Sequence, residues 1–161
     1  MAAIISPLLS EKLILVASDH GGYDLKEFVK GFLLKEDYRV DDMGTHAADS
    51  VDYPDYGARL ASRVSKGEVS RGILVCGTGI GMSIVANRFP NVRGALCHDL
   101  FTAAMSRQHN DSNILILGGR VLEKGAALEI VRTWLTTPFE GGRHDLRLEK
   151  IKSLENGFFR P

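Results

Sequence analysis

The segment GILVCGTGIG at residues 72–81 joins a short apolar run to a turn in which every second residue is glycine. An apolar strand that leads into a tight turn and then a helical stretch is the repeating unit of α/β proteins. We find four further strand candidates, at residues 13–17, 38–43, 92–97 and 114–117, each followed by a turn and a helical stretch. Because the runs are continuous rather than alternating, they predict a parallel sheet with helices on both faces.

We therefore expect one α/β domain over residues 1–161, a Rossmann-like three-layer fold whose five parallel strands have the order 2-1-3-4-5. Residues 1–12 are expected to form an N-terminal extension and residues 156–161 a frayed tail. In such a sheet ligands bind beyond the carboxyl ends of the first and third strands, where the strand order reverses. Two polar turns, at residues 18–22 and 76–81, follow those strands, so we expect the site there.

Composition argues against several classes of function. The chain has 20 basic and 20 acidic residues, and this zero net charge does not favour nucleic acid or an anionic membrane as a partner. No apolar run is long enough to span a bilayer, and the first residues lack the basic start of a signal peptide. Neither Cys76 nor Cys97 belongs to a C-x-x-C pair, so we expect free thiols and a cytoplasmic location.

The glycine turn is the strongest chemical signal. Its three glycines are Gly77, Gly79 and Gly81. They expose backbone N–H groups that can hold an anion, and a thiol beside them is expected to be partly ionised near neutral pH. Such a thiol can remove a proton next to a carbonyl while the N–H groups hold the enediolate oxygen. The alternative is a buried Cys76 without a catalytic role, but the three glycines together with Thr78 favour function.

Two histidines and one aspartate are weaker candidates. Asp19 and His20 follow the first strand and could orient hydroxyls or meet a phosphate, although Asp19 could equally cap the next helix. His109 ends a helix and could act as an acid/base. Taken alone, His109 is better interpreted as a cation that a helix C-terminus favours.

Arginines supply the candidate phosphate ligands. Arg143 and Arg147 are four residues apart and share one helix face, and Arg120 follows the fifth strand. A guanidinium matches the geometry of a phosphate, but a solvated helix face is the commoner explanation of such a pair. Tyr53 could place its ring over a ligand or simply begin a helix.

Together these segments resemble the type B ribose-5-phosphate isomerases, a family shared with allose-6-phosphate and galactose-6-phosphate isomerases. The resemblance covers about residues 13–151 and rests on five ordered segments, at residues 18–22, 52–54, 76–81, 106–111 and 140–144. It implies an aldose–ketose isomerase that interconverts ribose 5-phosphate and ribulose 5-phosphate through a cis-enediolate, without a metal or organic cofactor. Some members use a glutamate as the base, but Met82 and Ser83 after the last glycine place this chain with the cysteine class.

The resemblance also implies individual roles. Cys76 would move the proton between C2 and C1, with Thr78 and Asp19 steering oxygens beside the glycines, and His109 would assist ring opening. The substrate-binding groups would be Tyr53 and Asn110 for the sugar, and His20, Arg120, Arg143 and Arg147 for the phosphate. Because family sites lie between subunits, the resemblance implies a homodimer, or a tetramer as the alternative. His109 and Asn110 would then come from the partner subunit, and the origin of Arg120 is left open.

Three rival functions remain at this stage. An isomerase of a four- or six-carbon aldose phosphate would differ only in pocket length. A non-catalytic nucleotide- or flavin-binding module is less favoured, because Met82 stands where a dinucleotide fingerprint needs glycine and no P-loop Gly-Lys-Ser/Thr is present. A cysteine hydrolase that pairs Cys76 with His109 is also less favoured, because we expect no orienting acid near His109.

Overall fold

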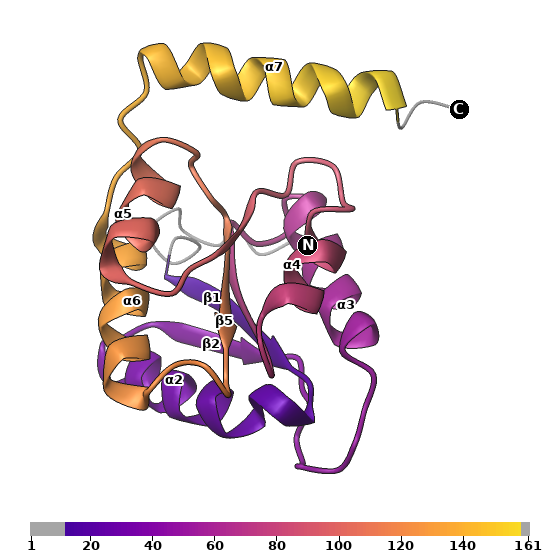
Figure 1. Ribbon diagram of the computed structural model, residues 1–161, viewed down its shortest axis with the longest axis vertical. Coiled ribbons are helices and arrows are strands. Elements are labelled where there is room, and N and C mark those ends of the chain that lie inside the picture. The colour runs from indigo at the N-terminus through magenta and orange to yellow at the C-terminus, as the bar shows by residue number, and fades with distance from the viewer. Residues whose placement is uncertain (1–11, 159–161) are drawn as a thin grey trace, which may run out of the picture.

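The computed structural model describes residues 12–158, and in this range a central sheet is flanked by helices (Figure 1). The strands are β1 (Leu13–Ser18), β2 (Arg39–Asp42), β3 (Arg71–Cys76), β4 (Gly94–Leu96) and β5 (Ile114–Gly118). The helices are the 3-10 turn η1 (His20–Gly22), α2 (Tyr23–Lys35), α3 (Tyr53–Ser65), α4 (Ile80–Ala86), α5 (Leu100–Gln108), α6 (Lys124–Thr136) and α7 (Arg143–Phe158). The expected extension (1–12) lies outside the described residues except for Lys12. Of the expected tail (156–161), residues 156–158 continue α7 and the rest lies outside the described residues.

The sheet is parallel throughout, and its order is β2-β1-β3-β5-β4. The predicted five-stranded parallel sheet is therefore confirmed, whereas the predicted order of the last two strands is wrong. Burial explains why β5, and not β4, lies next to β3. All five residues of β5 are buried, and β5 runs beside β3 from the pair Gly72–Ile114 to the pair Cys76–Gly118. β4 has three half-buried residues, which suits a short strand at the edge of a sheet.

Alternate residues of each strand face two separate cores, which makes three layers. Ile14 and Val16 of β1 pack with α2, α5 and α6. Leu15 and Ala17 face the opposite side and pack with α3 and α4. Trp134 of α6 is fully buried, and its indole N–H donates to Ser112 Oγ at 2.8 Å. Apolar cover on both faces explains why the strands carry continuous apolar runs.

A buried ion network joins α2 to β2. The Lys26 side chain is 1% exposed, and its Nζ donates to both Asp42 carboxylate oxygens at 2.8 Å. Lys30 Nζ lies 2.7 Å from Asp42 Oδ2, and the N–H of Gly44 donates to Asp42 Oδ1 at 3.0 Å. Burial alone would raise the pKa of Asp42, but the bonds from Lys26, Lys30 and Gly44 lower it to about 2. The network therefore ties the end of β2 to the helical layer.

The helix α7 lies across one end of the molecule, outside the three layers (Figure 1). Leu146 and Leu154 on this helix are 64% and 60% exposed. Near its end, Glu155 accepts the backbone N–H of Asn91 at 3.1 Å. Neither α7 nor any other helix within residues 12–158 is long and apolar enough to cross a membrane.

Candidate active site

The turn after β3 holds the thiol against a backbone donor. Cys76 is 5% exposed, and the N–H of Gly79 donates to its Sγ at 3.2 Å. Gly79 has a φ of 80°, and a Cβ at this position would collide with Leu96 Cδ1, so only glycine fits. Thr78 Oγ1 accepts the N–H of Ile80 at 3.3 Å and closes the turn. A donor aimed at the sulfur stabilises negative charge on it, as a base would need.

The turn after β1 touches the turn after β3, as the switch-point argument predicts. A Cβ on Gly21 would lie 3.2 Å from the backbone N of Gly77, so these two glycines allow the close approach. Asp19 is 8% exposed, and its Oδ1 accepts the N–H of Gly22 at 2.9 Å. The capping role that the sequence suggested for Asp19 is therefore confirmed, with the 3-10 turn η1 as the capped element.

Three larger side chains surround these turns. The Tyr53 ring lies on Gly81, where an added Cβ would be 2.6 Å from ring atoms. The Arg120 side chain lies along Gly77, and the Arg120 N–H donates to the carbonyl of Gly77 at 2.9 Å. His20 Nδ1 is 3.2 Å from both the backbone N and the backbone O of Val51, which fixes the ring. A phenol and a guanidinium thus flank the thiol turn, and the imidazole belongs to the neighbouring turn after β1.

His109 and Asn110 lie at the opposite edge of the sheet, where the amino-terminal ends of the strands meet. Both precede β5, and Arg93, which precedes β4, donates from Nε to the carbonyl of Asn110 at 3.0 Å. Cys76 instead aligns with Gly118, the last residue of β5. A strand of this length separates the two edges by about 13 Å. Within one chain, therefore, Cys76 and His109 do not meet.

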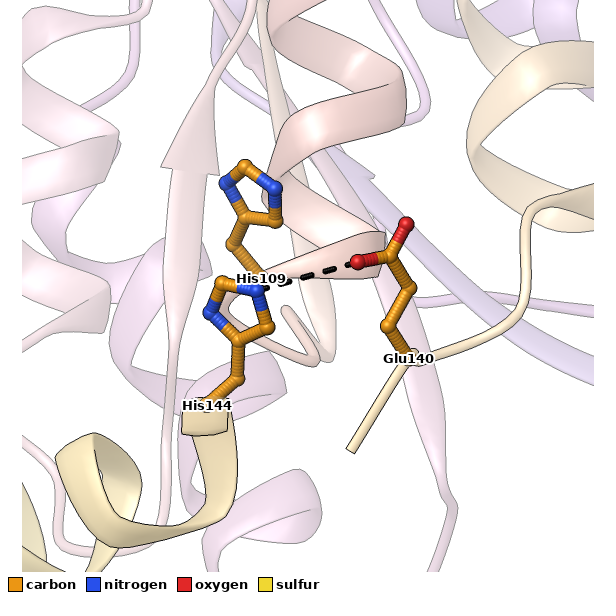
Figure 2. A group of neighbouring side chains, drawn as sticks. All are labelled: His109, Glu140 and His144. Carbon is orange, nitrogen blue, oxygen red and sulfur yellow. Dashed lines mark ion pairs between the residues drawn. The ribbon is translucent and has the colours of Figure 1, made fainter. Parts of the chain in front are cut away.

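His109 belongs to a cluster with the residues that begin α7 (Figure 2). The rings of His109 and His144 stack with centroids 4.3 Å apart and planes 13° from parallel. Glu140 Oε2 lies 3.7 Å from His144 Nε2. Arg143 Nε is 3.4 Å from the same nitrogen, and Arg147 Nη1 is 3.4 Å from His144 Nδ1. Burial, followed by the charges of His109, Arg143 and Arg147, lowers the pKa of His144, so this ring stays neutral near pH 7.

The predicted site residues thus fall into two groups at opposite edges of the sheet. One group, which we call the thiol edge, contains Asp19, His20, Tyr53, Cys76, Gly77, Thr78, Gly79, Gly81 and Arg120. The other, the histidine edge, contains the predicted residues His109, Asn110, Arg143 and Arg147. Glu140 and His144, to which the sequence analysis assigned no role, lie beside them. Arg120 lies on its own chain's thiol edge. The Cys76–His109 pair of a hydrolase does not form within one chain.

Sequence reasoning missed Glu140 and His144. The expectation that no acid lies near His109 is wrong, because ligand-type atoms of His109, Glu140 and His144 all lie within 4.8 Å of one another. The spacing of four residues between Glu140 and His144 is a visible signal. What brings them together is the turn at Gly141 and Gly142, with φ values of 66° and 60°, and its path cannot be read from spacing alone.

Comparisons with known proteins agree with this architecture. The family model for ribose/galactose isomerases matches residues 14–151. A putative sugar phosphate isomerase of Bacillus subtilis is 50% identical over 143 residues, which cover 88% of this chain and 96% of that protein. Ribose-5-phosphate isomerase B of Escherichia coli is 43% identical over 144 residues, which cover 89% of this chain and 97% of that protein.

Solved structures give the same picture. Ribose-5-phosphate isomerase B of Clostridium thermocellum superposes with a TM-score of 0.89 at 51% identity, covering 91% of this chain and 99% of that one. The Mycoplasma genitalium enzyme with bound ribulose-5-phosphate superposes with a TM-score of 0.87 at 38% identity, covering 89% and 96%. Sequence and fold agree over nearly the whole length, and the chain belongs to the ribose/galactose isomerase family.

Proposed function

We propose that the protein interconverts ribose 5-phosphate and ribulose 5-phosphate, with Cys76 as the base. The observation that carries this proposal is the Cys76 sulfur, held 3.2 Å from the Gly79 N–H inside a turn that Arg120 and Tyr53 flank. A base, an oxyanion site and a phosphate-binding cation thus lie together, as an aldose–ketose isomerase of a sugar phosphate needs. The similarity to ribose-5-phosphate isomerase B of Escherichia coli supports this activity. The proposal includes a cytoplasmic location.

The proton transfer follows from the position of the thiolate. Cys76 takes the proton from C2 of the open-chain aldose, the C–H pair forms the C1–C2 double bond, and the carbonyl pair moves onto O1. The N–H groups of the glycine turn hold this cis-enediolate, with Thr78 and Asp19 steering the oxygens. The Cys76 thiol then returns the proton to C1, while O1 gains the proton that the O2 hydroxyl loses. The product is the ketose, and the thiolate is regenerated.

The remaining groups come from a second copy of the chain. The histidine edge carries the ring-opening group and two arginines, but it lies about 13 Å from the thiol edge of its own chain. In the proposed homodimer, the histidine edge of one chain covers the thiol edge of the other, and a tetramer would pair two such dimers. His109 of the partner subunit then assists ring opening and Asn110 of the partner subunit binds hydroxyls. His20, Arg120, the partner's Arg143 and the partner's Arg147 hold the phosphate.

Replacing the base tests this assignment. Cys76→Ala should lower isomerase turnover by about 10³-fold or more, because the proton has no acceptor, while ribulose 5-phosphate still binds. Cys97→Ala is the matched control, since Cys97 is also buried and its burial raises the pKa of its thiol. This control should keep the wild-type rate. Undiminished turnover in Cys76→Ala would contradict the assignment.

Substrate choice needs its own measurement. Turnover assays with four-, five- and six-carbon aldose phosphates should give the highest kcat/KM for the five-carbon substrate, because the similar proteins of Escherichia coli and Mycoplasma genitalium are ribose-5-phosphate isomerases. Preference for another length would move the assignment to the corresponding aldose phosphate. Binding of a sugar phosphate without turnover of any of the three would instead favour a non-catalytic module.

A further inference from the structure

We propose that His109, Glu140 and His144 form a binding site for a divalent transition-metal ion such as Zn²⁺, and that metal bound there inhibits the isomerase. Each residue offers one ligand atom, and these atoms all lie within 4.8 Å of one another (Figure 2). Two imidazoles and one carboxylate with an open fourth position are a common ligand set for zinc. Glu140 supplies the one negative charge among the three ligands.

The spacing of the ligand atoms is close to what zinc requires. Ligands of one tetrahedral zinc ion lie about 3.4 Å apart, and His144 Nε2 lies 3.7 Å from Glu140 Oε2. Figure 2 shows a nitrogen of each ring on the side that faces Glu140. A metal must lie in the plane of each imidazole, so the stacked rings have to tilt toward one point. His109 is half-buried and lies at the C-terminal end of α5, so this ring rather than the buried His144 ring is the one that would tilt.

Arg143 and Arg147 carry positive charges next to His144 and oppose metal binding, so removing such a charge should strengthen it. Arg143 Nε lies 3.4 Å from His144 Nε2, the nitrogen that would face the ion. The Arg143 side chain is exposed and must swing away when metal binds. Its charge repels the ion, so Arg143→Gln should bind Zn²⁺ more tightly than the wild type. If Glu140 alone attracted Zn²⁺, Arg143→Gln would also raise the affinity. Variants of the histidines are therefore needed as well.

Inhibition follows from the shared histidine, and this part rests on the proposed function of His109. A metal ion occupies the imidazole lone pair that ring opening would use. Zn²⁺ and substrate should therefore compete, and the chelator EDTA should restore the rate. Metal at this position is not a cofactor, because no step of the isomerisation uses it.

The decisive experiment is a calorimetric titration of Zn²⁺ into the full chain carrying Cys76→Ser, which removes the active-site thiol as a competing ligand. We expect one ion per chain. Glu140→Gln keeps the shape of an exposed side chain and should weaken binding by about tenfold or more, as should His144→Gln. His46→Gln is the matched control: His46 is 72% exposed, lies 3.9 Å from Asp42, and should leave the affinity unchanged.

The outcomes separate this proposal from the isomerase assignment. Absence of a Zn²⁺ site, or a site that Glu140→Gln and His144→Gln leave unchanged, would overturn the proposal whatever the enzyme catalyses. In the otherwise wild-type chain, Zn²⁺ should inhibit Glu140→Gln less than the wild type, with each rate measured relative to the same protein's own metal-free rate. Zn²⁺ that binds at these residues without slowing turnover would overturn the inhibitory role. A chain without metal-free isomerase activity would instead contradict the proposed function and leave the calorimetric result standing.

Discussion

The thiol edge and the histidine edge are built in different ways. At the thiol edge, glycine backbones touch, and Cys76 and Asp19 are buried against N–H donors. At the histidine edge, long side chains gather around His144 beside a helix that lies outside the three layers (Figure 1). The thiol edge is held by packed backbone, whereas the histidine edge is held by contacts between charged and aromatic side chains. Under the proposed function, the two edges are the two halves of a site that a second chain completes.

Mixing two inactive variants tests this division most strongly. Cys76→Ala should lose about 10³-fold or more in turnover, and His109→Gln should lose about 10²-fold or more. Equal amounts refolded together should recover about one quarter of the wild-type activity, because half of the dimers are mixed and each of these has one site with both native residues. Each variant refolded alone is the control. A mixture that recovers nothing would place both residues in a site within one chain.

Removing the arginines of the histidine edge should weaken substrate binding more than chemistry. Arg143→Gln or Arg147→Gln should raise KM for ribose 5-phosphate about tenfold to a hundredfold, because each removes a charged hydrogen bond to phosphate. The kcat should change far less, and steady-state kinetics separate the two constants. Lys150→Gln, at an exposed residue of the same helix, should leave both constants unchanged. An unaltered KM in both arginine variants would place the phosphate elsewhere.

The ion network near the thiol edge should matter for stability instead. Lys26→Met should lower the free energy of unfolding by about 2 kcal/mol, measured by urea denaturation, because the Asp42 carboxylate loses its most buried partner. The exposed fraction of Lys30 is 27%, so Lys30→Met should cost less. Arg143→Gln should leave the urea midpoint unchanged, since the Arg143 side chain is exposed. Equal losses of stability in Lys26→Met and Arg143→Gln would contradict this difference between the two edges.

Much of the thiol edge was predictable because its signals are local. The Cys76 turn and the Asp19 turn each follow a strand directly, and parallel strands bring their carboxyl ends to one edge. The order of β4 and β5 was not predictable, since both obey the same strand–turn–helix rhythm. They differ in length and burial, which only the assembled sheet decides.

The histidine edge was harder to read because its contacts are not local. His144 at the start of α7 meets His109 at the end of α5, although β5 and α6 lie between them in the chain. Near the thiol edge, the contact of Lys26 with Asp42 on a different element was hidden for the same reason. A lysine beside apolar Leu25 on a helix carries no sign of burial until its carboxylate partner is placed. The resemblance implied that His109 works opposite a thiol from another chain, and the topology is consistent with that by placing His109 at the far edge of its own sheet.

Acid should lower the free energy of unfolding in two separate pH ranges, one set by His144 at the histidine edge and one set by Asp42 near the thiol edge. The pKa of His144 is lowered from 6.5, so the unfolded chain binds a proton first, and stability falls as pH drops through and below that value. The pKa of Asp42 is lowered from 3.8 to about 2, so its contribution, about 1–2 kcal/mol after allowance for solvent screening, is present at neutral pH and lost as pH falls from about 5 toward 2.

Urea denaturation at a series of pH values distinguishes these windows. His144→Gln should remove the upper decline, and Asp42→Asn should remove the lower one while lowering stability at pH 7. Asp49→Asn, at an exposed carboxyl, should change neither window. Asp42→Asn could instead leave the loss of stability below pH 5 intact. In that case the Lys26–Asp42 network does not stabilise the thiol edge, and backbone packing alone holds that edge together.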